Sequence, residues 1–153
     1  DARVAAAAAM IAIDTNLLIY AHRSGTPEHV DARRAIESAL NAPGGCGVAT
    51  PSVAEFFSIV THPTATGNPS PPDVAAEFLQ SLRESGVDDL TPGPGFAARL
   101  ARMAANLGVT GARVFDLQIG LCALDGGATS VWTHDGGFVK IPGLSVHDPL
   151  TAA

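Results

Sequence analysis

Four acidic residues lie where predicted strands end or predicted helices begin: Asp14, Glu55, Asp116 and Asp135. Asp14 directly follows residues 10–13, a short apolar run of the kind that forms a buried parallel strand. Open α/β sheets bind their ligands at the edge where the carboxyl ends of the strands meet. Carboxylate oxygens are the ligands that hard cations such as Mg²⁺ and Mn²⁺ prefer. The pattern therefore predicts a divalent-metal site at one edge of a sheet.

The chemistry that such a site supports is hydrolysis of a phosphodiester bond. A divalent ion lowers the pKa of a bound water and stabilises negative charge on a transferring phosphoryl group. Clustered carboxylates repel one another without a cation, so a buried acidic cluster itself predicts one. We therefore expect metal-assisted hydrolysis, in which water attacks the phosphorus in line. No Ser-His-Asp or Cys-His set is evident, and the five histidines lack metal-binding spacing.

Each acid also has a plain structural alternative. Asp14 suits the N-cap of a helix that follows it. Glu55 suits a capping box with Ser52 as the cap. If Thr50 caps this helix and Pro51 is its first residue, the capping box is lost and Glu55 points elsewhere.

The other two acids have similar alternatives. Asp116 suits the N-cap of the helix that it opens. Asp135 precedes Gly136 and Gly137 and suits a turn. All four plain roles are compatible with one another, but the acids recur at equivalent points of successive strand–helix units, and this recurrence favours a shared site.

The elements that must position these acids alternate along the chain. Strands are expected at residues 10–13, 46–50, 87–91, 130–133 and 144–146. Helices are expected at residues 17–21, 27–40, 51–61, 73–85, 96–107 and 116–124. Because no strand directly precedes Asp116, its position at the sheet edge is an assumption. The alternation implies right-handed β–α–β crossovers and therefore a parallel sheet covered by helices.

Composition narrows the class of protein. With 153 residues, 46% of them hydrophobic, the chain is long enough for one globular domain with a sizeable core. No apolar run approaches the roughly 20 residues that a membrane span requires. A net charge of −6 argues against binding nucleic acid through a broad basic surface, although a metal-dependent nuclease remains compatible with it. We expect residues 1–9 to be a cloning remnant and residues 10–150 to form the domain.

The two cysteines, Cys46 and Cys122, form neither a disulfide framework nor a metal-binding pair. Cys122 lies in an apolar helical stretch, where we expect a buried free thiol. This usage fits a reducing cytoplasm.

Four segments of the chain together resemble the motifs of PIN-domain nucleases. They are I-D-T-N at 13–16, P-S-V-A-E-F at 51–56, F-D-L-Q-I at 115–119 and T-H-D-G-G-F at 133–138. In size and spacing the chain is most similar to the VapC-type toxins of bacterial type II toxin–antitoxin pairs. The resemblance covers residues 10–149, and its specificity lies in the order and spacing of the motifs.

This resemblance implies a five-stranded parallel sheet with helices on both faces and an Mg²⁺- or Mn²⁺-dependent endoribonuclease activity. It implies that Asp14 and Asp116 are the firmest metal ligands, with Glu55 and Asp135 helping to hold the ion or its waters. It also implies an RNA substrate, a homodimer, and a cognate antitoxin that covers the acidic site.

Asn16 and Thr133 match polar residues that often accompany the first and last acids of the family. A turn or capping role is the alternative for both. Two positions depart from the family pattern. Gly137 stands where many relatives carry a further acid, which favours one metal ion over two, and Phe115 stands where many relatives carry a polar residue or histidine.

Arg113, three residues before Asp116, is the best single candidate for a phosphate contact, and an ordinary surface arginine is the alternative. We expect His134 to be a solvent-facing loop residue. The apolar residues of the third helix exceed what one helix side buries, so part of this surface is a candidate partner contact: Phe56, Phe57, Ile59 and Val60.

Two other functions compete with the nuclease interpretation. One is a catalytically silent PIN-like module that binds protein or RNA, which the complete set of four acids disfavours. The other is a phosphatase with an aspartate nucleophile, which D-T-N disfavours because it lacks a second aspartate two residues after Asp14.

Overall fold

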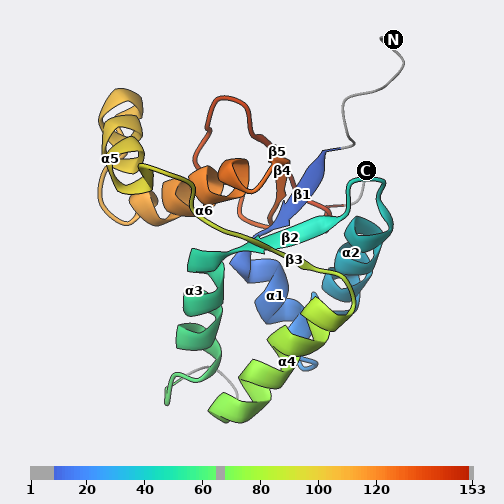
Figure 1. Cartoon of the computed structure of the whole chain (residues 1–153). Coiled ribbons are helices and arrows are strands. Elements are labelled where there is room, and N and C mark those ends of the chain that lie inside the picture. Colours follow the sequence, from blue (N-terminus) through green and yellow to red (C-terminus); the bar gives the residue numbers. More distant parts are fainter. Residues whose placement is uncertain (1–8, 65–67, 152–153) are drawn as a thin grey trace.

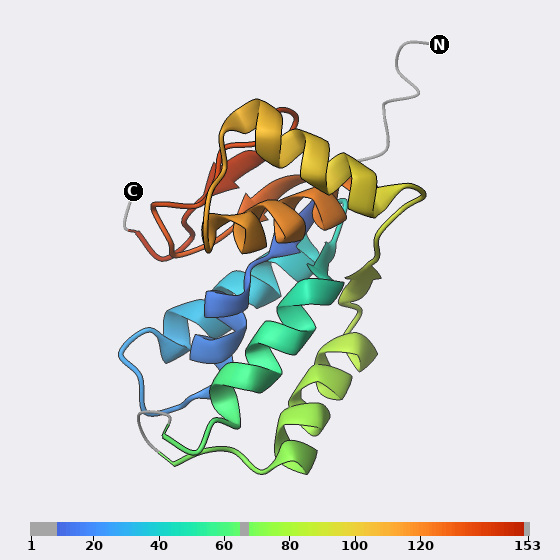
Figure 2. The same cartoon turned by 90° about the vertical axis from the view of Figure 1, so that its left-hand side faces the viewer.

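A computed structural model describes residues 9–64 and 68–151. Its centre is a five-stranded sheet in the order β3-β2-β1-β4-β5, and all neighbouring strands are parallel. Figures 1 and 2 show helices on both faces of this sheet. The predicted α/β architecture is confirmed. Residues 1–8, most of the predicted remnant, lie outside the described residues.

All eleven predicted elements are present, with shifts of a few residues at their ends. The strands are β1 Met10–Ile13, β2 Cys46–Ala49, β3 Asp88–Leu90, β4 Ala128–Trp132 and β5 Ser145–His147. The helices are α1 Thr15–His22, α2 His29–Asn41, α3 Thr50–Val60, α4 Pro72–Glu84, α5 Phe96–Leu107 and α6 Arg113–Asp125. Among the described residues no helix is both long and apolar enough to cross a membrane.

β1 is the central strand because its neighbours bury it on both edges and helices bury it on both faces. Ile11 pairs with Cys46 of β2, and Ile13 pairs with Trp132 of β4. Its side chains alternate between two cores, since successive residues of a strand point to opposite faces. Ala12 therefore joins one core while Ile11 and Ile13 join the other.

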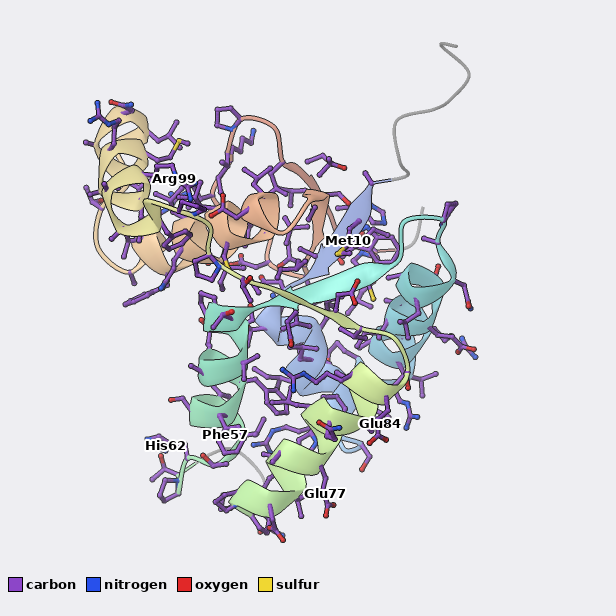
Figure 3. The ribbon with its side chains drawn as sticks, viewed as in Figure 1. Met10, Phe57, His62, Glu77, Glu84 and Arg99 are labelled. Carbon is purple, nitrogen blue, oxygen red and sulfur yellow. The ribbon has the colours of Figure 1, made fainter. Side chains whose placement is uncertain are left out.

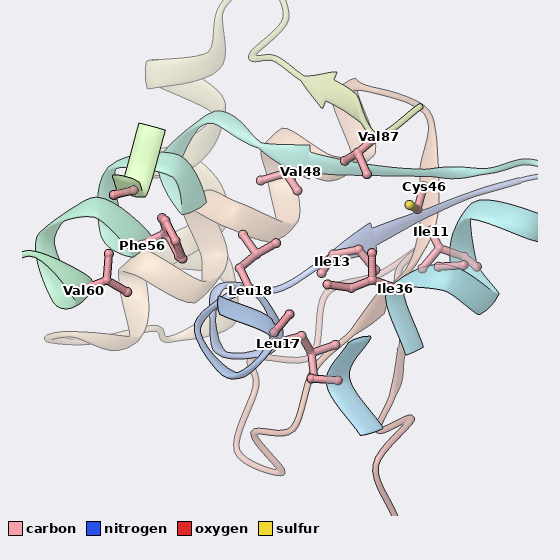
Figure 4. Packing of buried hydrophobic residues seen from close by; sticks show 14 residues of the cluster. Ile11, Ile13, Leu17, Leu18, Ile36, Cys46, Val48, Phe56, Val60 and Val87 are labelled. Atoms are coloured by element: carbon pink, nitrogen blue, oxygen red, sulfur yellow. The ribbon is translucent and has the colours of Figure 1, made fainter. Parts of the chain in front are cut away.

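The larger core lies between the sheet and helices α1 to α4. Figure 4 shows Ile13 and Ile36 gathered in this core with Leu18 of α1 and Phe56 of α3. The second core lies on the other face, where α6 packs on the sheet and α5 covers α6. Two packed faces of this kind fix the positions of the strand ends, which is what a site built there requires.

The contact between β3 and its neighbours depends on two glycines beside Leu90. A Cβ added to Gly47 would lie 2.8 Å from the Leu90 side chain, and one added to Gly126 would lie 2.7 Å from it. Leu90 itself is only 1% exposed. The Sγ of Cys122 also donates to the Leu90 carbonyl at 2.9 Å, so β3, β2 and the end of α6 meet at this residue.

Cys122 is buried and free, as predicted, and Cys46 is buried and free as well. Burial raises the pKa of the Cys46 thiol to about 11, and the nearby Asp88 carboxylate adds to this effect. Its thiolate is therefore scarce at neutral pH, which fits a packing role.

Candidate active site

The carboxyl ends of β1 and β4 bring together residues that are far apart in the sequence. The backbone N–H of Asp14, just after β1, donates to the carbonyl of Trp132 at 3.0 Å. Thr133 directly follows Trp132, and its hydroxyl donates to Asp14 Oδ2 at 2.7 Å. The parallel register thus places the first predicted acid beside the start of the last predicted motif.

Asp14 has both a capping and a site-forming geometry. It is the N-cap of α1, and its Oδ1 accepts from the backbone N–H of Thr15 at 2.8 Å. Its other oxygen is held by Thr133 at the sheet edge. The capping alternative is therefore correct for Asp14, yet it uses only one of the two carboxylate oxygens.

Asn16 and Thr133 lock the ends of β1 and β4 together. The Asn16 Nδ2 donates to Thr133 Oγ1 at 2.9 Å, and its Oδ1 accepts from the backbone N–H of His134 at 3.0 Å. Thr133 Oγ1 also accepts from the backbone N–H of Asp135 at 3.0 Å. Thr133 is 1% exposed, so these bonds are shielded from water. This network is compatible with the predicted supporting role of both residues, which stays a prediction.

Burial dominates the electrostatics of Asp14, which is 5% exposed. Burial raises its pKa above the ordinary value, because the charged form loses its hydration. The hydrogen bonds from Thr133 and Thr15 oppose this shift, and repulsion by Glu55 and Asp135 adds to it. The carboxylates of α3 and of the loop after β4 are therefore close enough to act on Asp14.

Asp116 completes this electrostatic group from the first turn of α6. Burial raises its pKa, and the charges of Asp14 and Asp135 raise it further. A hydrogen bond from the backbone of Val139 and the positive charge of Arg113 act in the opposite direction. The four predicted acids thus share one region, although they come from four separate segments.

The sequence pattern of the PIN domain family matches residues 11–144. The chain belongs to the PIN domain family. It is 28% identical to Ribonuclease VapC48 of Mycobacterium tuberculosis over 139 residues. The aligned region covers 90% of this chain and 96% of that relative.

Solved structures have the same fold. VapC20 of Mycobacterium tuberculosis, described as a Sarcin-Ricin loop cleaving toxin, superimposes with a TM-score of 0.62 at 13% identity, covering 86% of this chain and 98% of VapC20. VapBC2 from Rickettsia felis, solved on a DNA fragment from its promoter, gives a TM-score of 0.66 at 15% identity, covering 90% of this chain and 97% of that one.

The carboxylates of this PIN domain do not form a closed metal cage. In the part of the chain that the structure describes, no three His, Cys, Asp or Glu side chains are grouped closely enough to hold one ion together. Mg²⁺ in proteins keeps several waters and often binds through only one or two carboxylates. The donor set therefore fits an ion held by one or two of the acids, with waters filling the other positions.

Two capping alternatives are wrong. The N-cap of α3 is Ala49, because β2 continues directly into the helix, so neither Ser52 nor Thr50 caps it and the capping box of Glu55 does not form. The Thr50 hydroxyl donates to the Leu90 carbonyl at 3.4 Å instead of capping the helix. The N-cap of α6 is Ala112, which leaves Asp116 inside the first turn rather than at the cap. The turn role of Asp135 is confirmed, since its Oδ1 accepts from the Gly137 N–H at 2.8 Å.

The expectation for His134 is also wrong. Its Nδ1 lies 2.9 Å from Asp148 Oδ2, its side chain is only 33% exposed, and its ring meets that of Tyr20 edge to face. Sequence reasoning did not single out Asp148. The signal was available, because Asp148 directly follows β5 just as Asp14 directly follows β1.

Arg113 lies at the exposed start of α6, three residues before Asp116. Its charge lowers the pKa of Asp116, so the guanidinium is close enough to act on that carboxylate. This position is compatible with the predicted phosphate contact, which stays a prediction.

Proposed function

We propose that this PIN domain is an endoribonuclease toxin that hydrolyses RNA with a divalent cation, Mg²⁺ or Mn²⁺, and is neutralised by a cognate antitoxin. One observation carries the proposal: Asp14 is fixed by Thr133 at the sheet edge and is acted on by the charges of Glu55 and Asp135, while its own charge acts on Asp116. The relatives named as VapC ribonucleases support the reaction class.

The cation would be held by Asp14 and Asp116, with Glu55 and Asp135 holding its waters. When bound, it would offset the repulsion among the carboxylates and stabilise negative charge on the phosphate oxygens. The chain's own residues prepare this site before any ion arrives. Thr133 holds Asp14 in a single orientation, which reduces the rearrangement that binding requires.

Each supporting residue has a distinct task in this proposal. Asn16 keeps the loop after β4 against α1, so that the backbone carrying Asp135 is positioned relative to Asp14. Arg113 offers a guanidinium to a phosphate oxygen of the substrate, where arginine can form paired hydrogen bonds.

The proposed partners are the antitoxin and a second copy of the chain. Phe56 and Val60 of α3 are fully buried, whereas Ile59 is 43% exposed, so α3 keeps apolar surface outside the core. A cavity of about 210 Å³ opens between α3 and α4, and Phe57 of α3 lines this cavity. The solved VapBC2 structure is a toxin–antitoxin complex, and this neighbour supports an antitoxin partner. An antitoxin arginine reaching the carboxylates would compete with the cation.

Cleavage of RNA by the purified protein, free of antitoxin, tests the enzyme. We expect cleavage with Mg²⁺ or Mn²⁺, loss of cleavage with a chelator, and loss in Asp14→Asn. Glu77→Gln is a matched control, since Glu77 is an exposed acid on α4, away from the strand ends (Figure 3). A protein that cleaves RNA under no metal condition would instead favour the silent binding module.

A further inference from the structure

Phe115 is the most exposed of the large hydrophobic side chains in the described residues, at 57%. It is the third residue of α6 and directly precedes Asp116. The helix buries its apolar side through later residues such as Leu117 and Ile119, at 0% and 2% exposure. Phe115 therefore contributes an aromatic ring to the surface next to a candidate ligand of the metal, and this ring does not serve the core.

The electrostatics of the molecule make a neutral contact valuable at this place. The chain carries a net charge of −6, and four carboxylates surround the site, so phosphate groups are repelled until a cation binds. Arg83 and Arg99 are already engaged in ion pairs with Asp89 and Asp125. Stacking of a nucleobase on an aromatic ring is an uncharged contact, and the protein's negative charge does not weaken it.

The start of α6 offers both contacts that a nucleotide needs. Arg113 is close enough to Asp116 for its charge to act on that carboxylate, so a guanidinium group and a carboxylate lie on one side of the helix. Successive helix residues are turned by about 100°, so Phe115 is about 100° from Asp116 and about 160° from Arg113, and Asp116 lies between the two around the helix. The backbone N–H groups of Val114 and Phe115 are bonded to Gly111 and Ala112, so side chains rather than the helix start must hold the nucleotide.

We propose that Phe115 is a stacking platform for an unpaired base of single-stranded RNA, with a phosphate of the same strand held at the acidic site between Phe115 and Arg113. The inference rests on the proposed ribonuclease function and deepens it, because it names the class of RNA. A base must be turned out of a helix to stack on a protein ring, so loops and single strands are favoured over duplexes. Stacking accepts every base, so Phe115 would select unpaired structure rather than one sequence.

Binding tests the platform directly. The probe is a short fluorescein-labelled single-stranded RNA, measured by anisotropy in an Asp14→Asn background that prevents cleavage. Phe115→Ala should weaken binding by at least about fivefold, and Phe115→Trp should retain it. Val30→Ala is a matched control, since Val30 on α2 is 55% exposed and should leave binding unchanged.

The salt dependence separates stacking from charge. The slope of log affinity against log salt changes by about 0.7 for each phosphate of a single strand that the protein ceases to neutralise. Phe115→Ala should weaken binding at every salt concentration with the slope unchanged, whereas Arg113→Gln should reduce the slope by about this amount. A changed slope in Phe115→Ala would contradict an uncharged contact.

Cleavage by the protein with Asp14 intact locates the base and separates the two proposals. In a series of RNAs, each lacking the base at one position along the strand, the parent protein should cleave more slowly when the base that stacks on Phe115 is missing. Phe115→Ala should cleave that RNA and the intact RNA at the same rate. If the parent cleaves RNA and Phe115→Ala binds and cleaves equally well, the platform is refuted and the ribonuclease stands. If the parent never cleaves but Phe115→Ala weakens RNA binding, the ribonuclease fails and the platform stands. A change in oligomeric state instead of RNA affinity would make Phe115 an interface residue and also refute the platform.

Discussion

Thr133 donates a hydrogen bond of 2.7 Å to Asp14 although the two residues are 119 positions apart. The bond exists because β1 and β4 are neighbouring parallel strands that end at the same level. It joins the first and last motifs of the chain at the sheet edge, and it connects the stability of the fold to the chemistry of the candidate site.

Replacing Thr133 with valine should damage both properties. The change keeps the side-chain shape but removes the hydroxyl that bonds Asp14 Oδ2, Asn16 Nδ2 and the Asp135 N–H, which costs about 1–3 kcal/mol of unfolding free energy. Since the hydrogen bond that is removed normally lowers the pKa of Asp14, this pKa should rise further and move the acidic limb of RNA cleavage to higher pH. Urea unfolding and a pH–rate profile would measure the two effects. Thr133→Ser should restore most of both, and a valine variant with an unshifted profile would contradict the role of the bond.

Asp14 should make the metal-free protein lose stability as the pH rises. Its pKa in the folded protein is raised, so the fold favours the protonated carboxyl. The corresponding stability is fully present below the ordinary aspartate pKa and is lost as the pH rises through the raised value. With a chelator present, the unfolding free energy of the parent should therefore fall relative to that of Asp14→Asn from about pH 4 to neutral pH.

Adding Mg²⁺ should reverse this trend, since an ion that binds only the folded state stabilises it by mass action. The melting temperature of the parent should rise with Mg²⁺ concentration, and that of Asp14→Asn should rise little. Equal stabilisation of both proteins by Mg²⁺ would remove Asp14 from the metal site.

Much of the fold could be predicted because its signals are local. The apolar run of β1, the helix stripes and the glycine and proline turns each specify an element from neighbouring residues. Parallel pairing then follows from the alternation of strands and helices, and with it the meeting of Asp14 and Thr133 at one edge.

Other features of the site could not be predicted, because long-range contacts decide them. His134 looks like an exposed loop residue until β5 places Asp148 beside it. The Thr50 hydroxyl suits a helix cap until β3 brings the Leu90 carbonyl within reach. Asp116 has no strand before it in the sequence, and only the packing of α6 on the sheet gives it its position.

The Arg99–Asp125 ion pair should stabilise the junction of α5 and α6 in a pH-dependent way. Figure 3 shows Arg99 projecting from α5, and its two terminal nitrogens donate to Asp125 at 2.9 and 2.7 Å. These hydrogen bonds, together with one from Gly93, hold the pKa of Asp125 below its usual range. The stability that they provide is present above the ordinary aspartate pKa and is lost as the pH falls through the lowered value.

Asp125→Asn should therefore lower the melting temperature by a few degrees at neutral pH, and the difference from the parent should shrink in acid. The Arg99 side chain is 40% exposed, so high salt should also reduce the difference. Thermal melts at several pH values and salt concentrations would measure this. A difference that persists unchanged at low pH would assign the effect to packing rather than to the ion pair.

Gly126→Ala should destabilise the contact between the end of α6 and β3. The added Cβ would lie 2.7 Å from a methyl carbon of Leu90 and 3.0 Å from its backbone Cα, and backbone atoms cannot move away as a side-chain end can. Overpacking of this kind costs about 1–3 kcal/mol, which chemical denaturation would measure. Gly25→Ala is the matched control, because its added Cβ meets nothing within 4 Å and should leave the unfolding free energy nearly unchanged. Equal losses at the two positions would contradict the importance of the space beside Leu90, whereas a loss at Gly126 alone would show that Leu90 needs this space to hold β3 in the sheet.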